Sequence, residues 1–451
     1  MIEGQVEEYV DAPPRGRAAA PRVSALVSAK GAALRERLAA ALATDAVRVP
    51  LAVFLISRLY VFLVGAIAMQ IDETLPPVAA LGYFMPELNG LAHYLLQPWR
   101  NWDGHWYALA AREGYSYDRA VTAFYPGYSL LLRWGDWLLG GRVELAGVLI
   151  SNLCFLAALF LLYRLVALDF SAPIARRTVL YLALFPTAYY FSAVYSESLF
   201  LLLTVAAFYA ARRDRWWLAG ACGFFAALTR TQGVLILLPL VILFVRQHGF
   251  NPRRWRVNPM GLTLVPAGLM VYMAYLRREW DDPLVMIRVQ KEWERYSANP
   301  LETMRAGVEQ LNSCAVRDWP GGVDFCWTTR IMQHPGLATI RDLHWRWALS
   351  ESNTIELAFT ILLLALGFAA LRLLPLAYSS YLAAGILLPL WSPSHVHALM
   401  SMHRFMLVLF PAFIVLAMLG RWRVAHAAIV VVSTVLLAFF INQFASWLWV
   451  A

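Results

Sequence analysis

Charge is scarce in this chain, and lysine is almost missing. Only 15% of the 451 residues are charged, 60% are hydrophobic, and the mean hydropathy is +0.55. Soluble domains carry about 25% charged residues, so the composition argues against a water-soluble globule and predicts a polytopic membrane protein. Two of the 38 basic side chains are lysines, Lys30 and Lys291, which leaves 36 arginines. The arginines gather in short loops and in the N-terminal tail, a pattern that favours membrane topology over nucleic-acid binding.

Cysteine is also sparse, with four in the chain. Cys154 and Cys222 fall inside apolar segments, where we expect small buried hydrophobic residues. Cys314 and Cys326 lie in the one long polar loop, and whether they form a disulfide depends on whether that loop faces an oxidising compartment. Residues 1–49 lack a short apolar core followed by a cleavage site, so we interpret them as a cytoplasmic tail and not as a signal peptide.

Long hydrophobic runs dominate the rest of the chain. Residues 50–449 are therefore interpreted as one transmembrane domain of about 11 helices, and no internal repeat is evident in it. The apolar segments, each able to cross a bilayer or to enter it and return, lie at about 50–70, 143–166, 178–190, 196–211, 216–229, 231–246, 259–276, 353–371, 374–391, 404–420 and 424–449.

The arginines orient these segments. They cluster at alternate connections, which predicts that these connections and the N-terminus are cytoplasmic. The remaining connections then face outward: two long loops, 71–142 and 277–352, and the shorter connections Tyr189–Tyr195, Thr229–Gln232 and 392–403. The clusters are Arg164/Arg176/Arg177, Arg212/Arg213/Arg215, Arg246/Arg253/Arg254/Arg256, Arg372 and Arg421/Arg423.

Two features of this topology need a separate interpretation. A full crossing by segment 121–139 would invert every later loop, so we expect it to lie on the outer surface, where Arg133, Trp134, Asp136 and Trp137 suit an interfacial helix. Four segments between 178 and 246 are shorter than the roughly 20 residues that a crossing needs. A cavity that enters the membrane from outside would explain their length.

The first candidate for chemistry is the stretch Asn101–Tyr107, "NWDGHWY", in the first outer loop. Asp103 stands among aromatic residues, which stack on sugar faces but also line membrane interfaces. Asp103 is either a general base or metal ligand at the mouth of the cavity, or an ordinary loop acid or helix cap. The neighbouring candidates for substrate contact are Trp102, His105, Trp106 and Tyr107.

Three further polar stretches lie on the same predicted side. Glu197 in "VYSES", with Tyr195, is a site carboxylate or a helix cap. Arg230, followed by Gln232, is a phosphate ligand or an interfacial anchor. His403 and Arg404 follow His395 and His397 in the last outer loop. A metal site of these histidines lacks an accompanying carboxylate, so contact of Arg404 with phosphate or sugar is favoured.

Taken together, these stretches resemble the PIG-V family, which contains the second mannosyltransferase of GPI-anchor assembly and its prokaryotic relatives. The resemblance is carried, in order, by "WDGHWYALAAREGY", "AFYPGYSLLLR", "FPTAYYFSAVYSESLFLLL", "AALTRTQGVLILLPL", "DDPLVMIRVQ" and "SMHRFMLVLFPAFIVLA", between about residues 50 and 420. It implies a GT-C glycosyltransferase, an all-α multi-spanning enzyme that takes mannose from a polyprenyl-phosphate donor on the non-cytoplasmic face. In such enzymes an acid of the first outer loop serves the active site, and Asp103 is the matching position.

We therefore expect a one-step inverting transfer in which Asp103 is the base and Arg230 and Arg404 meet the leaving phosphate. No cofactor is required on this interpretation, and a divalent ion held by Asp103 and Glu197 is the less favoured variant. The expected partners are the donor, membrane lipids and a lipid-linked, glycan or protein acceptor, but no nucleic acid. The arginine and alanine bias suggests a prokaryotic plasma membrane. A transporter or lipid-sugar flippase is the alternative, and it would place charges along a path to both faces.

Overall fold

The computed structural model describes residues 44–71, 88–255, 259–310, 353–395 and 397–446. The chain separates into two units, Met1–Arg48 and Val49–Ala451, and only residues 44–48 of the first are described. Within the described ranges all regular elements are helices, and the one extended pairing is an isolated bridge between Arg295 and Ser394. The prediction of an all-α fold is confirmed. The Cys314–Cys326 pair lies outside the described residues.

Six helical segments of the described chain are long and apolar enough to cross a membrane, which indicates an integral membrane protein. The number of crossings stays a prediction, because several other apolar helices are shorter. The six comprise α2 (Asp45–Ile71), α6 (Val143–Asp169), η5 with α10 (Thr231–Ile236, Leu237–His248), η7 with α11 (Pro259–Thr263, Leu264–Trp280), α16 (Asn353–Leu373) and α20 (Arg423–Ala445). The shorter ones are α7 (Ala172–Leu184), α8 (Glu197–Arg212), α9 (Trp216–Thr229), α17 (Leu376–Leu390) and α19 (Phe410–Leu419).

Proline breaks two of the predicted segments. The segment predicted at 178–190 ends as helix at Leu184, since the residue before Pro186 is disfavoured in the helical conformation; the short helix η4 (Ala188–Phe191) follows. The segment predicted at 404–420 is two helices, α18 (Met402–Leu407) and α19, because Pro411 has no N–H to bond the Leu407 carbonyl. Both breaks free the backbone for the polar turns that form the site.

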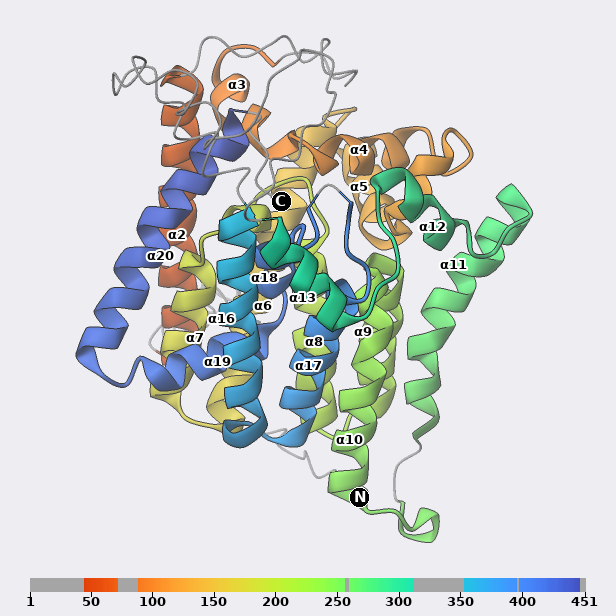
Figure 1. The fold of residues 1–451 in the computed structure, drawn as a ribbon, viewed down its shortest axis with the longest axis vertical. Coiled ribbons are helices and arrows are strands. Elements are labelled where there is room, and N and C mark those ends of the chain that lie inside the picture. The colour runs from red at the N-terminus through yellow and green to blue at the C-terminus, as the bar shows by residue number, and fades with distance from the viewer. Residues whose placement is uncertain (1–43, 72–87, 256–258, 311–352, 396, 447–451) are drawn as a thin grey trace, which may run out of the picture. The chain divides into compact units, whose positions relative to one another are not determined.

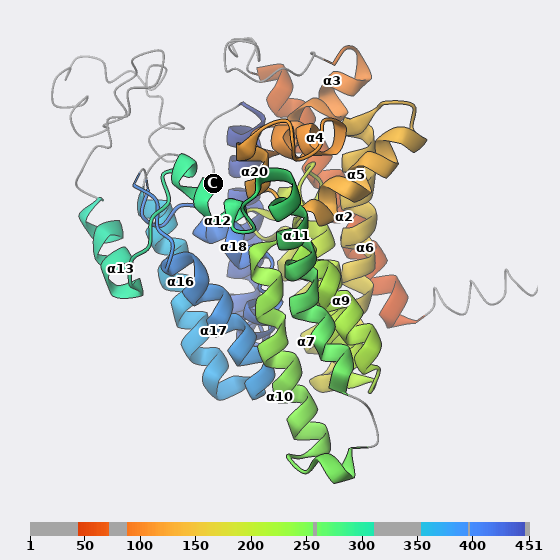
Figure 2. The same cartoon turned by 90° about the vertical axis from the view of Figure 1, so that its right-hand side faces the viewer.

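At one end of the bundle, α4 (Asp103–Arg112) and α5 (Pro126–Leu138) lie beside each other, linked by η3 (Arg119–Ala123) (Figures 1 and 2). With 13 residues, α5 is about 20 Å long and too short to cross a bilayer. Its Trp134 and Trp137 are 64% and 71% exposed, as suits the interfacial helix predicted there. Two shorter helices precede α4, namely α3 (Leu91–Leu95) and η2 (Gln97–Arg100).

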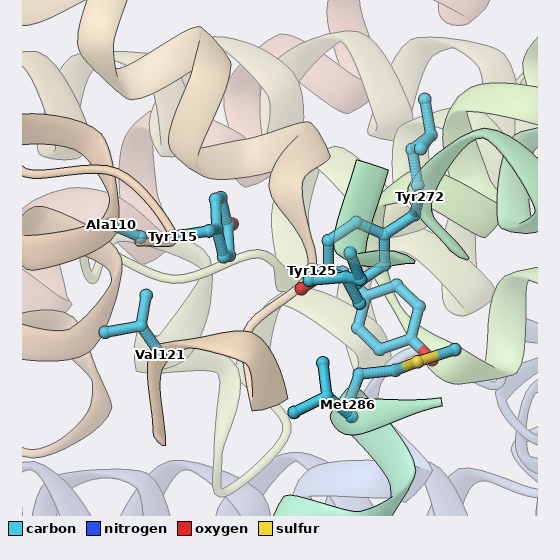
Figure 3. Packing of buried hydrophobic residues seen from close by; sticks show 9 residues of the cluster. Ala110, Tyr115, Val121, Tyr125, Tyr272 and Met286 are labelled. Carbon is cyan, nitrogen blue, oxygen red and sulfur yellow. The ribbon is translucent and has the colours of Figure 1, made fainter. Parts of the chain in front are cut away.

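An aromatic cluster fixes this layer to the bundle (Figure 3). Tyr115 and Tyr125, from the segments on either side of η3, pack with Tyr272 of α11, at ring-centroid distances of 5.7 and 5.1 Å from it. The Tyr272 hydroxyl donates to the Thr122 carbonyl at 2.9 Å, and the Trp280 indole donates to the Tyr115 carbonyl at 2.9 Å. The layer that contains α4 is therefore held against α11 by buried packing and hydrogen bonds. Beyond α11 follow α12 (Val285–Arg288), η8 (Val289–Trp293) and α13 (Pro300–Glu309).

Candidate active site

Arg404 lies at the centre of a buried ion-pair cluster. Its Nη1 donates to Asp103 Oδ2 at 2.5 Å, and its Nε donates to Glu197 Oε1 at 2.6 Å. Asp103 is the first residue of α4, Glu197 is the first residue of α8, and Arg404 lies in the six-residue helix α18. One guanidinium thus ties together three helices from distant parts of the sequence.

Arg230 supplies the second positive charge of the cluster. Its Nη1 lies 2.7 Å from Glu197 Oε1 and donates to the Ser196 hydroxyl at 3.1 Å, and its Nε donates to Gln232 Oε1 at 3.0 Å. The turn that carries Arg230 passes close to α9: a Cβ added at Gly233 would lie 2.1 Å from the Ala226 carbonyl oxygen. Only glycine lets η5 return this tightly.

The cluster is electrically balanced, since Asp103 and Glu197 oppose Arg230 and Arg404. Glu197 is fully buried and would be very costly in a membrane without its two arginines. It is not a helix cap, because the N-cap of α8 is Ser196 and its side chain makes no capping bond. Both acids have one oxygen that accepts no hydrogen bond within the described residues, namely Glu197 Oε2 and Asp103 Oδ1. Glu197 Oε2 is enclosed, whereas the Asp103 side chain is 24% exposed. Asp103 Oδ1 is therefore the carboxylate oxygen available to a substrate.

The backbone before Asp103 is held in a strained turn. Trp102 adopts φ 57° and ψ −123°, a conformation that residues with a Cβ rarely adopt. The Tyr195 hydroxyl donates to the Asn101 carbonyl at 2.9 Å and accepts from the Asp103 N–H at 2.9 Å, so it spans this turn. Burial, and then the charge of Asp103, raises the pKa of Tyr195 well above its ordinary value, which keeps the donating proton in place.

Aromatic and hydroxyl groups complete the wall of the cluster. The Arg404 guanidinium carbon lies 4.8 Å from the ring centroid of Tyr195 and 5.0 Å from that of Tyr190, distances typical of cation–π contacts. The Tyr107 hydroxyl and the Ser196 hydroxyl are 2.7 Å apart. Four of the predicted residues, Tyr107, Tyr195, Arg230 and Arg404, are thereby joined to the two acids, and Gln232 through Arg230.

The other predicted residues lie at the edge of the cluster or make contacts outside it. Trp106 stacks on Phe124 at 5.8 Å and meets the Trp293 ring edge-on at 5.4 Å, and His105 packs against Trp106. Burial and the nearby Arg100 lower the pKa of His105, which favours its neutral form. His403 does not join the cluster, because its Nδ1 lies 3.0 Å from Glu356 Oε2 and its ring stacks on Phe440 at 5.7 Å. Its contact with a substrate stays a prediction.

Within the described residues, the histidines of the last predicted outer loop are not gathered into a group of potential metal ligands. His395 stacks on Tyr296 at 4.1 Å, apart from the contacts of His403. Across the described ranges, no group of three or more His, Cys, Asp or Glu side chains is placed to hold an ion. The two site acids are bridged by arginine.

Sequence reasoning missed two charged residues beside this cluster. Glu356 of α16 accepts from the Ser401 and Met402 N–H groups at 2.9 and 3.0 Å and so caps α18. Arg295 lies in the segment after η8, and its guanidinium carbon is 5.9 Å from the ring centroid of Phe405, the neighbour of Arg404. Glu356 could have been found, because it is the one acid in the apolar run 354–370. Arg295 could not, because other charged residues surround it in the sequence.

The fold and this site define the class: a polytopic, all-helical integral membrane protein with a buried cluster of two arginines and two acids. Residues 47–250 match the sequence model of the family described as mannosyltransferase (PIG-V). The predicted resemblance to the PIG-V family is confirmed over this region, which includes Asp103, Glu197 and Arg230 but not Arg404.

Individual relatives agree with this match. The chain is 28% identical to human GPI alpha-1,6-mannosyltransferase 2 over 260 residues, which is 50% of this chain and 50% of that protein. It is 33% identical to GPI mannosyltransferase 2 of Cryptococcus neoformans over 167 residues, which is 34% of this chain and 39% of that protein. The chain thus spans half or less of the length of these curated relatives.

Two solved structures show a distant likeness, each at 13% sequence identity. The apo oligosaccharyltransferase of Archaeoglobus fulgidus has a TM-score of 0.40, covering 89% of this chain and 56% of that one. ArnT of Cupriavidus metallidurans, bound to undecaprenyl phosphate, has a TM-score of 0.35, covering 81% of this chain and 78% of that one.

Proposed function

We propose that the protein is a mannosyltransferase that moves mannose from a polyprenyl-phosphate donor to an acceptor hydroxyl, at the non-cytoplasmic face of a prokaryotic plasma membrane. The match to the PIG-V family supports the sugar and the class of reaction. The observation that carries the proposal is Asp103, an acid fixed on one oxygen by Arg404 and open on the other. Glu197 also leaves one oxygen without a hydrogen bond, but that oxygen is enclosed, whereas the Asp103 side chain is 24% exposed.

The proposed reaction is a single displacement at the anomeric carbon. The acceptor oxygen bonds to that carbon, the bond from the carbon to the phosphate oxygen breaks, and the prenyl phosphate departs as an anion. The proton of the acceptor hydroxyl passes to Asp103 Oδ1. One displacement inverts the anomeric configuration.

The surrounding residues give Asp103 a fixed direction. Arg404 holds Oδ2, and Tyr195 holds the backbone on both sides of Trp102. Glu197 in turn fixes Arg404 and Arg230. General bases act within hydrogen-bond reach of the proton, so fixing the carboxylate lowers the cost of reaching the reactive geometry.

The experiment that tests this proposal is a transfer assay. Purified protein in lipid nanodiscs is mixed with radiolabelled polyprenyl-phosphate mannose and membrane extract, and the labelled product is identified. We expect mannose transfer by the wild-type protein and strongly reduced transfer by Asp103→Asn. A polyprenyl-phosphate glucose arm tests the sugar. Absence of any labelled acceptor with well-folded protein would contradict the proposal, and movement of intact donor between leaflets would favour the flippase alternative.

A further inference from the structure

Arg295 is a half-buried cation with no acidic partner among the described residues. Its Nη1 donates to the Ser392 carbonyl at 2.8 Å, and no carboxylate oxygen of the described residues lies within 4.0 Å of it. Within the same ranges, Nε and Nη2 make no hydrogen bond, yet neither is among the atoms enclosed without a partner. The N–H groups at Nε and Nη2 are therefore accessible to a ligand.

The three acids of this region, Asp103, Glu197 and Glu356, already have other partners. Arg404 and Arg230 already share Glu197, and Arg404 also holds Asp103. Glu356 is fully used, since its Oε1 accepts from Ser401 and its Oε2 accepts from Met402 and meets His403. Within the described residues, Arg295 is thus the arginine beside the site that contacts no carboxylate.

The position of Arg295 follows from two packing contacts. Two residues earlier, Trp293 packs edge-on against Trp106, which lies one turn after Asp103 on α4. The Arg295 guanidinium itself faces Phe405 of α18, next to Arg404. The extended pairing with Ser394, and the Tyr296 N–H donating to the Pro393 carbonyl at 3.0 Å, fix the backbone between these contacts. The segment therefore places Arg295 between α4, which carries Asp103, and α18, which carries Arg404.

Electrostatics supports the same assignment. Burial, and then the charge of Arg404, lowers the pKa of Arg295 to about 10, while Asp103 and Glu356 act in the opposite direction. Arg295 is still a cation at neutral pH, but a destabilised one. An anion that enters the site would relieve this cost.

We propose that Arg295 binds the phosphate of the prenyl-phosphate donor. This inference deepens the proposed function and rests on it for the identity of the ligand. The planar guanidinium can offer Nε and Nη2 as a fork to two phosphate oxygens while Nη1 stays on Ser392. Arg230 and Arg404, predicted from sequence to meet the phosphate, then serve to hold the carboxylates.

Binding of farnesyl phosphate, a short prenyl monophosphate, tests the assignment without any sugar transfer. Affinity is measured by the change in tryptophan fluorescence of the purified protein in nanodiscs of neutral lipid. We expect Arg295→Gln to weaken binding about 10- to 100-fold, and Arg295→Lys to weaken it less. The control is Arg288→Gln, since Arg288 is exposed and paired with Asp282 at 2.9 Å. Equal affinity of Arg295→Gln and wild type would overturn the proposal.

Three further ligands separate the sources of the phosphate. Farnesol should bind weakly and equally to the wild type and Arg295→Gln, because it has the tail but no charge. Inorganic phosphate tests a free anion, and vesicles containing phosphatidylglycerol test a lipid headgroup. If either loses as much affinity in Arg295→Gln as farnesyl phosphate does, Arg295 is a general anion or lipid site and the donor assignment fails.

A second measurement needs no variant, in case Arg295→Gln does not fold. Phenylglyoxal modifies accessible arginines, and peptide mass mapping reads each position. Farnesyl phosphate should protect Arg295 but not Arg288, and equal labelling of Arg295 with and without ligand would overturn the proposal. The same experiment distinguishes this proposal from the proposed function. If farnesyl phosphate protects Arg295 but the protein transfers no mannose, the anion site is supported and the transfer activity is contradicted.

Discussion

Arg404 and Asp103 lie 301 positions apart in the sequence and form a hydrogen-bonded ion pair of 2.5 Å between Nη1 and Oδ2. This contact gives the loop acid a fixed direction, because α18 is anchored in the bundle while α4 lies in the layer at its end. The same guanidinium is held by Glu197 on its other edge. The carboxylate, its counter-ion and the buried acid behind them thus form one unit, so substitutions in them should not be independent.

Asp103→Asn should lower turnover about 100- to 10,000-fold with little change in donor binding, because the amide keeps the shape but cannot accept the proton. Asp103→Glu should restore part of the rate. Turnover and donor affinity are measured separately in the transfer assay, with and without a chelator. A joint loss of chelator sensitivity and donor affinity would indicate a metal ligand. Near-normal turnover in folded protein would reduce Asp103 to a structural residue.

Glu197→Gln should destabilise the fold by about 3–5 kcal/mol, because it leaves two buried arginines facing each other without their shared acid. The double variant Glu197→Gln/Arg230→Gln removes one charge of each sign and should recover part of the loss. Thermal unfolding in nanodiscs measures both. Additive losses in the double variant would show that Glu197 and Arg230 are not coupled.

The individual residues of this unit were predictable from sequence, but their assembly was not. Asp103, Glu197 and Arg230 attract notice because charges are rare beside apolar runs. Contact between helices so far apart in the chain leaves no mark on a single sequence. Arg295 was not predicted for the opposite reason: it lies near Lys291, Glu292 and Glu294, where one more charged residue is not unusual.

The same contrast holds for the fold. Hydropathy predicted the long helices closely, as in α16, which spans Asn353–Leu373 against a predicted 353–371. The breaks inside the predicted segments 178–190 and 404–420 were missed, although Pro186 and Pro411 marked them. Length and hydrophobicity govern crossings, whereas the missing N–H of proline governs where the backbone opens for polar groups.

Tyr195→Phe should lower turnover about tenfold or more without removing any charged group. The hydroxyl bonds both the Asn101 carbonyl and the Asp103 N–H, and each bond is worth about 0.5–1.5 kcal/mol. Loss of both frees the strained turn at Trp102, so the base is less well directed. The control is Tyr117→Phe, since Tyr117 is 65% exposed. Equal turnover of the two variants would show that the Tyr195 hydroxyl does not position Asp103.

Glu356→Gln should weaken the cap of α18 and so loosen Arg404 without touching it. The carboxylate accepts two backbone N–H groups at the start of this six-residue helix, and loss of a cap costs about 0.5–2 kcal/mol. We expect a lower unfolding temperature and reduced turnover, with farnesyl phosphate affinity less affected. Glu309→Gln, at an exposed pair with Arg305, is the matched control. Unchanged stability and turnover in Glu356→Gln would exclude this role.

The last prediction concerns the side of the membrane. If the arginine clusters are cytoplasmic, position 113 at the end of α4 and position 213 after α8 lie on opposite faces. Both are exposed, so each can carry a single cysteine in a variant without native cysteines. An impermeant thiol reagent added to intact cells should label Glu113→Cys at once and Arg213→Cys only after the membrane is opened. Labelling of both from outside would contradict the topology, and the reverse order would place the Asp103 site in the cytoplasm.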